Sequence, residues 1–197
     1  MRKRWPSYIA CVVPIAVLGA AFYVTKPLPE PPNIPRNSPS KSRHSLRFAG
    51  DRGARDIRAN PQRTTIEELL AVKRPEGVDG GETHRRHEPF ETNLWMVEAK
   101  VIESVVRADG DFYLVIESNS GARTVAEIPD PKHLQDSHYR KEITAARASV
   151  LKMLNPTAQP KPCSLLATIT GIGFFGQQGK AGNGARLNPV IDIRWID

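Results

Sequence analysis

One stretch near the middle of the chain decides the fold, Asp109-Gly110-Asp111-Phe112-Tyr113-Leu114-Val115-Ile116. Asp-Gly is a favoured pair in tight turns between antiparallel strands, because glycine adopts positive φ at little cost. The residues after the turn are apolar or aromatic, which is typical of a strand that packs on a core. The stretch therefore predicts a β-hairpin.

The sequence on both sides of this hairpin continues the strand pattern. Between Leu94 and Val101, apolar residues alternate with polar ones, which predicts a strand before the turn. After the hairpin and a second turn at Gly121, residues 123–128 predict a third strand. Pro129 ends it, because proline donates no ladder hydrogen bond.

The order of the remaining elements indicates the fold class. Apolar residues at helical spacing predict an amphipathic helix over residues 139–154, and two more strands are predicted at residues 165–172 and 190–196. Three strands, a helix and two strands is the order of the OB fold. We therefore predict a mainly β protein with one packed helix, a five-stranded OB-fold barrel (β-β-β-α-β-β) over residues 94–197.

The N-terminus predicts a membrane segment. Arg2, Lys3 and Arg4 precede an 18-residue run without charge, residues 8–25, which is long enough to cross a bilayer as a helix. The basic head stays cytoplasmic by the positive-inside rule, so the rest of the chain is exported. We predict a signal anchor over residues 1–26 and a periplasmic C-terminal domain on the inner membrane. A cleaved signal peptide, which would release a secreted protein, is the alternative.

Two further segments precede the predicted barrel. Residues 27–63 are rich in proline and arginine and predict a disordered, solvated linker. Residues 64–93 predict a short helix and a loop, since Thr64 and Glu67 form a capping-box pattern and Arg74-Pro75 should end the helix.

The positive charge of the chain is unevenly distributed. The net charge is +7, but residues 31–63 alone hold eight basic and two acidic residues, whereas residues 94–197 hold twelve basic and eleven acidic ones. A nucleic-acid groove needs clustered lysine and arginine within the folded domain. We therefore expect no specific nucleic-acid site in the predicted barrel, although the basic linker could bind a polyanion.

The hairpin and the strand after it resemble the staphylococcal-nuclease-like (thermonuclease-type) branch of OB folds. In that family two aspartates hold calcium, an arginine on the third strand binds phosphate and a glutamate acts as general base. By this resemblance Asp111 and Asp130 would be the metal ligands. Arg123 matches the phosphate-binding arginine only loosely, about two positions from its expected place.

The resemblance fails at the general base. Pro131-Lys132-His133 stands where the family has its glutamate, and no second arginine can be assigned. Loss of a general base usually lowers a rate by orders of magnitude. The Asp-Gly-Asp sequence is also common in turns that bind no metal. His133 is the one residue that could replace the base.

The chain is also similar to uncharacterised exported bacterial OB domains. The shared blocks are Gly110-Asp111-Phe112-Tyr113-Leu114-Val115, Ala126-Glu127-Ile128-Pro129 and Gly171-Ile172-Gly173-Phe174-Phe175. In that pattern histidine is frequent at the positions of Tyr113 and Asn188. If those histidines do chemistry in the relatives, this chain has lost it.

A glycine-rich loop separates the last two predicted strands, where OB folds contact their ligands. Phe174, Phe175 and Lys180 lie in it and are ligand-binding candidates. The two phenylalanines would serve as exposed stacking groups or as packing at the barrel end. The loop is not a P-loop, since no Ser or Thr follows Lys180.

These features predict a function in binding. We expect a membrane-anchored, exported OB-fold module that is not an enzyme and that engages an envelope protein or a polyanion. The alternatives are a calcium-dependent nuclease or phosphodiesterase that uses Asp111, Asp130 and Arg123, and a structural component of an envelope assembly. No cofactor is expected, except calcium under the nuclease hypothesis.

Overall fold

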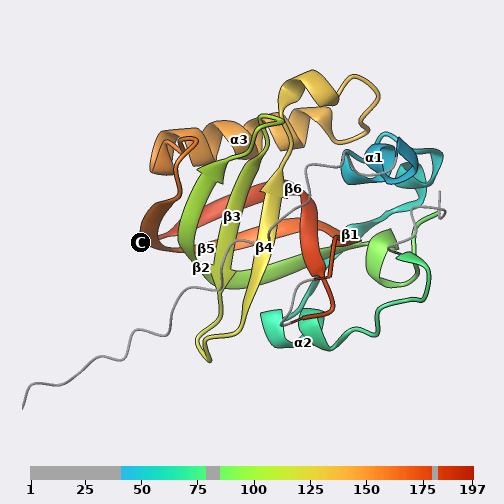
Figure 1. Ribbon diagram of the computed structural model, residues 1–197, viewed down its shortest axis with the longest axis horizontal. Helices are drawn as coiled ribbons and strands as arrows, with labels where there is room; N and C mark the ends of the chain where they lie inside the picture. Colours follow the sequence, from blue (N-terminus) through green and yellow to red (C-terminus); the bar gives the residue numbers. More distant parts are fainter. Residues whose placement is uncertain (1–40, 79–84, 179–181) are drawn as a thin grey trace, which may run out of the picture. The chain divides into compact units, whose positions relative to one another are not determined.

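The computed structural model describes residues 41–78, 85–178 and 182–197. Its elements, in chain order, are α1 (Lys41–Arg47), η1 (Arg52–Asp56), β1 (Arg58–Arg63), α2 (Ile66–Ala71), η3 (Phe90–Thr92), β2 (Asn93–Val106), β3 (Phe112–Glu117), β4 (Arg123–Ile128), η4 (Pro131–His133), α3 (Arg140–Leu154), β5 (Lys161–Phe175) and β6 (Ala185–Ile196). Figure 1 shows β2, β3 and β4 side by side, with α3 across one end of them.

Six strands form one sheet, in the order β1-β2-β3-β4-β6-β5, and β2 also pairs with β5. β2 therefore has three strand neighbours, and β3, β4, β5 and β6 have two each. β4 and β6 are parallel and meet where Ala126 pairs with Leu187, while β1 is parallel to β2. The predicted mainly β fold with one packed helix is confirmed.

Alternation along the strands separates a core face from an outer face. Leu114 and Ile116 of β3 and Ala126 and Ile128 of β4 are fully buried in the main hydrophobic core. The residues between them, such as Val115, point to the opposite side, which we call the outer face. Because successive side chains of a strand point to opposite faces, burial of the apolar residues fixes which side chains of β3 and β4 face the core and which lie on the outer face.

α3 agrees with its predicted amphipathic pattern. Its buried residues are Ile143, Ala146, Val150 and Leu154, which are the positions that the helical spacing selects. Asn155 ends the helix in the left-handed conformation, at φ 45°, which asparagine tolerates better than most residues.

The capping box of α2 lies one residue later than predicted. The Thr65 hydroxyl accepts the backbone N–H of Glu68, and the Glu68 carboxylate accepts that of Thr65. Thr64 donates its hydroxyl hydrogen to the same carboxylate. The helix ends at Ala71, before the predicted stop at Arg74-Pro75.

The linker prediction is wrong for residues 41–63, which fold into α1, η1 and β1. Leu46, Phe48, Ala54 and Ile57 are buried there, at 1%, 4%, 1% and 6% exposure. Their spacing follows neither the helical nor the strand period, so the sequence pattern did not reveal them. Residues 27–40 of the predicted linker, like the predicted anchor at residues 1–26, lie outside the described residues.

The segments before β2 share the core of the strands. Phe48, Ile66, Leu69 and Phe90 belong to the same buried cluster as the apolar residues of β3 and β4. The folded unit therefore begins before residue 64, and residue 94 does not mark its start. Among the helices of the described ranges, none has the length and apolar character needed to cross a membrane.

Phe48→Ala tests whether residues 41–63 belong to the fold. Removing a phenyl ring that is 4% exposed should lower the free energy of unfolding by about 3 kcal/mol. Arg58→Ala, at an exposed position of β1, is the matched control and should change it by less than about 0.5 kcal/mol. Urea unfolding of the full chain measures both. Equal, small effects would show that the segment is a solvated spacer.

Candidate functional site

The two aspartates that the resemblance assigns to a metal lie at the same end of the sheet. Asp111 directly precedes β3 and Asp130 follows β4, and these strands pair with Phe112 opposite Ile128. The backbone N–H of Asp130 donates to Asp111 Oδ1 at 2.8 Å. Gly110 allows this approach, because its φ is 91° and a Cβ there would collide with the Asp130 carboxylate.

The surroundings of these aspartates do not fit a calcium site. Asp111 Oδ2 accepts a hydrogen bond from Arg47 Nη2 at 3.0 Å, so each of its oxygens meets an N–H donor. Asp130 Oδ1 accepts from the backbone of Lys132, whose Nζ lies 3.5 Å from Oδ2. Calcium needs six to eight oxygen ligands. No group of three or more Asp, Glu, His or Cys residues suited to a metal occurs in the described ranges.

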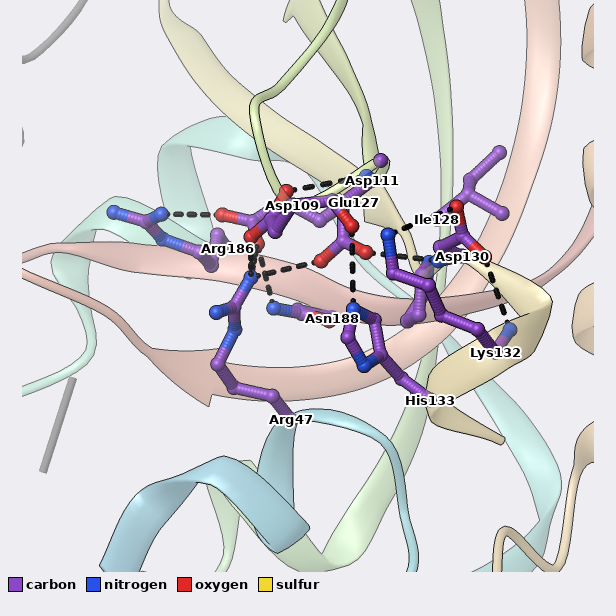
Figure 2. A network of polar contacts seen from close by, with 12 residues as sticks. Arg47, Asp109, Asp111, Glu127, Ile128, Asp130, Lys132, His133, Arg186 and Asn188 are labelled. Atoms are coloured by element: carbon purple, nitrogen blue, oxygen red, sulfur yellow. Dashed lines mark hydrogen bonds and ion pairs between the residues drawn. The ribbon is translucent and has the colours of Figure 1, made fainter. Parts of the chain in front are cut away.

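A buried glutamate, Glu127, lies at the centre of the polar contacts around Asp111 (Figure 2). It is 4% exposed. Its Oε1 accepts from Arg186 Nη1 at 2.5 Å, and its Oε2 accepts from Asn188 Nδ2 at 2.7 Å and from Arg47 Nη2 at 3.1 Å. We call this group the Glu127 network, which consists of Arg47, Asp109, Asp111, Glu127, Arg186 and Asn188.

Strand register explains why these residues meet. Ala126 of β4 pairs with Leu187 of β6, and both side chains are buried in the core. The next residue on β4 and both neighbours of Leu187 therefore face outward. These are Glu127, Arg186 and Asn188. The sequence places Glu127 and Arg186 59 positions apart, and only the β4–β6 pairing brings them together.

Neighbouring charges oppose the effect of burial on the pKa values of Glu127 and Arg47. Burial alone would raise the pKa of Glu127, but Arg186 and Arg47 hold it below its ordinary value. Burial would likewise lower the pKa of Arg47, but Glu127, Asp111 and Asp109 raise it. Glu127 is therefore ionised and Arg47 protonated at neutral pH.

Asp111 behaves differently from Glu127. Burial raises its pKa to about 6, against the opposing effect of Arg47. Its side chain is 3% exposed, and the neighbouring carboxylates of Asp109 and Glu127 also favour its protonated form. Asp111 is thus the group of this network that titrates just below neutral pH.

Several buried polar atoms around the network have no hydrogen-bond partner among the described residues. These are the Tyr113 hydroxyl, Asn188 Oδ1 and Arg186 Nε. Tyr113 lies opposite Glu127 in the β3–β4 pairing, so it shares the outer face. The guanidinium of Arg186 lies against Gly176, where a Cβ would collide with it. The chain thus packs closely around Arg186 and leaves acceptor capacity at Asn188.

The remaining site candidates lie away from Asp111 or are packed. Arg123 is at the opposite end of β4 and donates from Nε to Glu117 Oε2 at 2.6 Å. Phe174 is 5% exposed beneath the guanidinium of Arg43, and Phe175 is 2% exposed against Phe90. This burial favours packing over stacking for both rings. Lys180 lies outside the described residues.

His133, the possible substitute base, is held by contacts of its own. Its ring stacks on Phe48 at 5.0 Å between centroids, and its Nε2 lies 3.2 Å from the carbonyl oxygen of Asp109. A base must reach the proton that it abstracts, and this nitrogen faces a backbone oxygen.

Arg47 and Arg186 were not among the predicted site residues. Arg186 follows the glycine-rich loop and precedes the predicted last strand, and Arg47 lies in the segment interpreted as a linker. Glu127 did leave a signal, a carboxylate between the apolar residues Ala126 and Ile128 of a predicted strand. No family model matches this chain, and neither does any curated protein or solved structure. Its function is therefore inferred from geometry.

Asp111→Asn tests the electrostatics of the site. Because the pKa of Asp111 is raised from 3.8 to about 6, the folded state binds its proton more tightly than the unfolded chain. Stability from this group is present at low pH and falls as the pH rises from about 4 to about 6. The unfolding free energy of the wild type minus that of the variant should fall by about 2 to 3 kcal/mol over this interval. Urea unfolding at several pH values measures it, and a difference that grows with pH would contradict the assignment.

Proposed function

We propose that this protein is an OB-fold binding module, not an enzyme, and that it engages a polyanion. The strand pairing supports this fold, since the order β2-β3-β4-β6-β5 closes on itself through the pairing of β5 with β2. Along the chain, α3 lies between β4 and β5, the third and fourth of these five strands. In an OB-fold barrel the third and fifth strands are neighbours, as β4 and β6 are here.

The arginines of residues 52–63 carry the polyanion proposal. Arg43 and Arg47 are used inside the fold, where they pair with Glu91 and with the Glu127 network. Four others remain exposed along η1 and β1, namely Arg52, Arg55, Arg58 and Arg63. Cations on one ordered segment release counterions from a polyanion without requiring the segment to fold on binding.

The hydrolase alternative lacks comparable support. The carboxylates that the resemblance assigns to calcium accept hydrogen bonds from Arg47 and from backbone N–H groups. Arg123 is ion-paired with Glu117, at the opposite end of β4 from Asp130. The geometry therefore favours binding over metal-dependent hydrolysis.

We also propose that residues 1–26 anchor the module to the inner membrane, with residues 41–197 exported. The support is the basic head followed by an uncharged run of membrane-spanning length.

A charge-reversal series tests the polyanion proposal. Replacing Arg52, Arg55, Arg58 and Arg63 by Glu in the full chain should abolish binding to fluorescein-labelled heparin. The corresponding Arg→Gln variant should weaken it and reduce the slope of log K against log salt by up to about 3, because each phosphate-like contact contributes about 0.7 to 0.9. Fluorescence anisotropy over a range of salt concentrations measures both.

The matched control replaces four exposed cations elsewhere, Lys100, Arg140, Lys141 and Lys152, by Gln. It changes the net charge equally and should keep most of the affinity and slope. Equal loss in both variants would mean that only net charge matters. Salt-independent capture of an envelope protein would favour a protein partner. Calcium-dependent DNA cleavage that is lost in Asp111→Ala would support the nuclease alternative.

A topology experiment tests the anchor. A reporter fused after Asp197 should be active only outside the cytoplasm, because Arg2, Lys3 and Arg4 remain inside. Deletion of residues 1–26 should leave the protein in the soluble fraction. Cytoplasmic reporter activity would contradict the proposed orientation, and an unchanged membrane fraction after the deletion would contradict the anchor.

A further inference from the structure

Arg107 directly follows β2, and no carboxylate among the described residues forms an ion pair with it. We infer that Arg107 and Tyr113 form a binding site for one oxyanion group of a ligand, a carboxylate or a phosphate. We call these two residues the anion site. It contains none of the exposed arginines of η1 and β1, so the inference goes beyond the proposed polyanion binding.

The first evidence is a pair of nitrogen atoms that Arg107 leaves unbonded. Its Nε and Nη2 are buried, and neither has a hydrogen-bond partner among the described residues. The N–H groups of these two atoms point the same way and form one fork of the planar guanidinium, which matches two oxygens of a carboxylate or phosphate. Arg86 uses the same two atoms to bind Asp51, with Nε 3.1 Å from Oδ2 and Nη2 2.5 Å from Oδ1.

The second evidence is a buried hydroxyl group beside this fork. The guanidinium carbon of Arg107 lies 4.1 Å from the centroid of the Tyr113 ring. Tyr113 is 2% exposed, and its hydroxyl group has no hydrogen-bond partner among the described residues. Arg107 cannot accept the hydroxyl hydrogen, because a guanidinium group only donates. Native proteins leave few buried donors without an acceptor, and ligand oxygens would serve both the hydroxyl and the fork.

Strand geometry places both residues on the outer face. Tyr113 pairs with Val105 of β2, and the Arg107 backbone N–H continues this ladder by donating to the carbonyl oxygen of Asp111 at 2.9 Å. Arg107 lies two residues after Val105, so the two side chains point to the same face. The Arg107 carbonyl oxygen also accepts the N–H of Gly110 at 2.9 Å. The turn thus holds the Arg107 backbone in place before a ligand binds, which lowers the entropic cost of binding.

The neighbouring cations are paired, whereas Arg107 is not. Arg186 and Arg47 both donate to Glu127. Burial raises the pKa of the Tyr113 hydroxyl above its ordinary value, against the opposing effects of Arg186 and Arg107. Tyr113 is therefore protonated at neutral pH and acts as a donor. The positive charge of Arg107 and the hydroxyl hydrogen of Tyr113 together favour an anion.

The surroundings of Arg107 limit the size of the group that binds. The Arg107 side chain as a whole is half-buried, and Ala108 and Asp109 after it are exposed. A ligand therefore approaches from the turn between β2 and β3. The fork atoms themselves are covered, so the site suits one small oxyanion group and not the length of a polymer.

Titration of the full chain with sodium acetate and with sodium phosphate tests the inference. The Nε–H signal of Arg107 in a proton–nitrogen NMR spectrum is assigned by its loss in Arg107→Lys. It should shift saturably with at least one anion, with a Kd on the order of 1 mM. Sodium chloride at equal ionic strength should not shift it. A lower Kd for acetate would identify a carboxylate ligand, and a lower Kd for phosphate would identify a phosphate ester.

Two variants separate the parts of the site. Tyr113→Phe removes one donor and keeps the ring, so it should raise the Kd several-fold while the Arg107 signal still shifts. Arg107→Lys keeps the charge without the fork and should lose the saturable rise in melting temperature that the anion causes. Arg140→Lys, at an exposed position of α3, is the matched control and should keep that rise. The comparison is needed because phosphate also stabilises proteins without binding a specific site.

Three results would overturn the inference. The first is an unshifted Arg107 signal up to about 100 mM of either anion, roughly 100 times the expected Kd. The second is an equal rise in melting temperature for Arg107→Lys and the wild type. The third is an unchanged Kd in Tyr113→Phe, which also decides if Arg107→Lys does not fold.

One more comparison separates this site from the polyanion proposal. The variant in which Arg52, Arg55, Arg58 and Arg63 are replaced by Gln should keep the wild-type Kd for the small anion, and loss of the Arg107 shift there would contradict the anion site. Arg107→Lys should keep the affinity for heparin. Failure of the anion site and failure of polyanion binding are therefore distinguishable.

Discussion

A buried carboxylate stays ionised only if the chain brings cations to it, and Glu127 places this requirement on separate parts of the protein. β6 supplies Arg186 and Asn188, and α1 supplies Arg47. An unpaired charge at such depth would cost several kcal/mol. The register of β4 against β6 and the position of α1 therefore depend on each other through this one side chain.

The same principle explains why a segment rich in arginine is folded. Glu91 is fully buried, and it accepts hydrogen bonds from the backbone of His87 and Phe175 as well as from Arg43. Buried ion pairs contribute little net stability over apolar contacts, but breaking one is costly. Arg43 and Arg47 thus act chiefly to fix where α1 lies, while Leu46 and Phe48 supply the apolar burial.

The arrangement of charges around Glu127 also bears on the metal site that the nuclease resemblance implies. The end of the sheet that the nuclease resemblance would use for a metal is occupied by a protonated arginine and by backbone donors. The carboxylates of Asp111 and Glu127 are buried there and already paired with Arg47. Exposed arginines lie elsewhere, on η1 and β1. Within residues 41–63, Arg43 and Arg47 pair with buried carboxylates, whereas Arg52, Arg55, Arg58 and Arg63 are exposed.

The sequence by itself determined the elements with a regular period. The strands of the hairpin, the buried face of α3 and the mainly β class follow from alternation, helical spacing and turn residues, which act over a few positions. The starts of two strands were misplaced, since β5 begins at Lys161 and β6 at Ala185, four and five residues before the predicted starts. Tertiary structure alone decided that residues 41–63 fold and that Arg47, Glu127 and Arg186 meet. Arg47 and Glu127 are 80 positions apart. Compensation of buried charge depends on which strands are neighbours and in what register, and no local pattern encodes that.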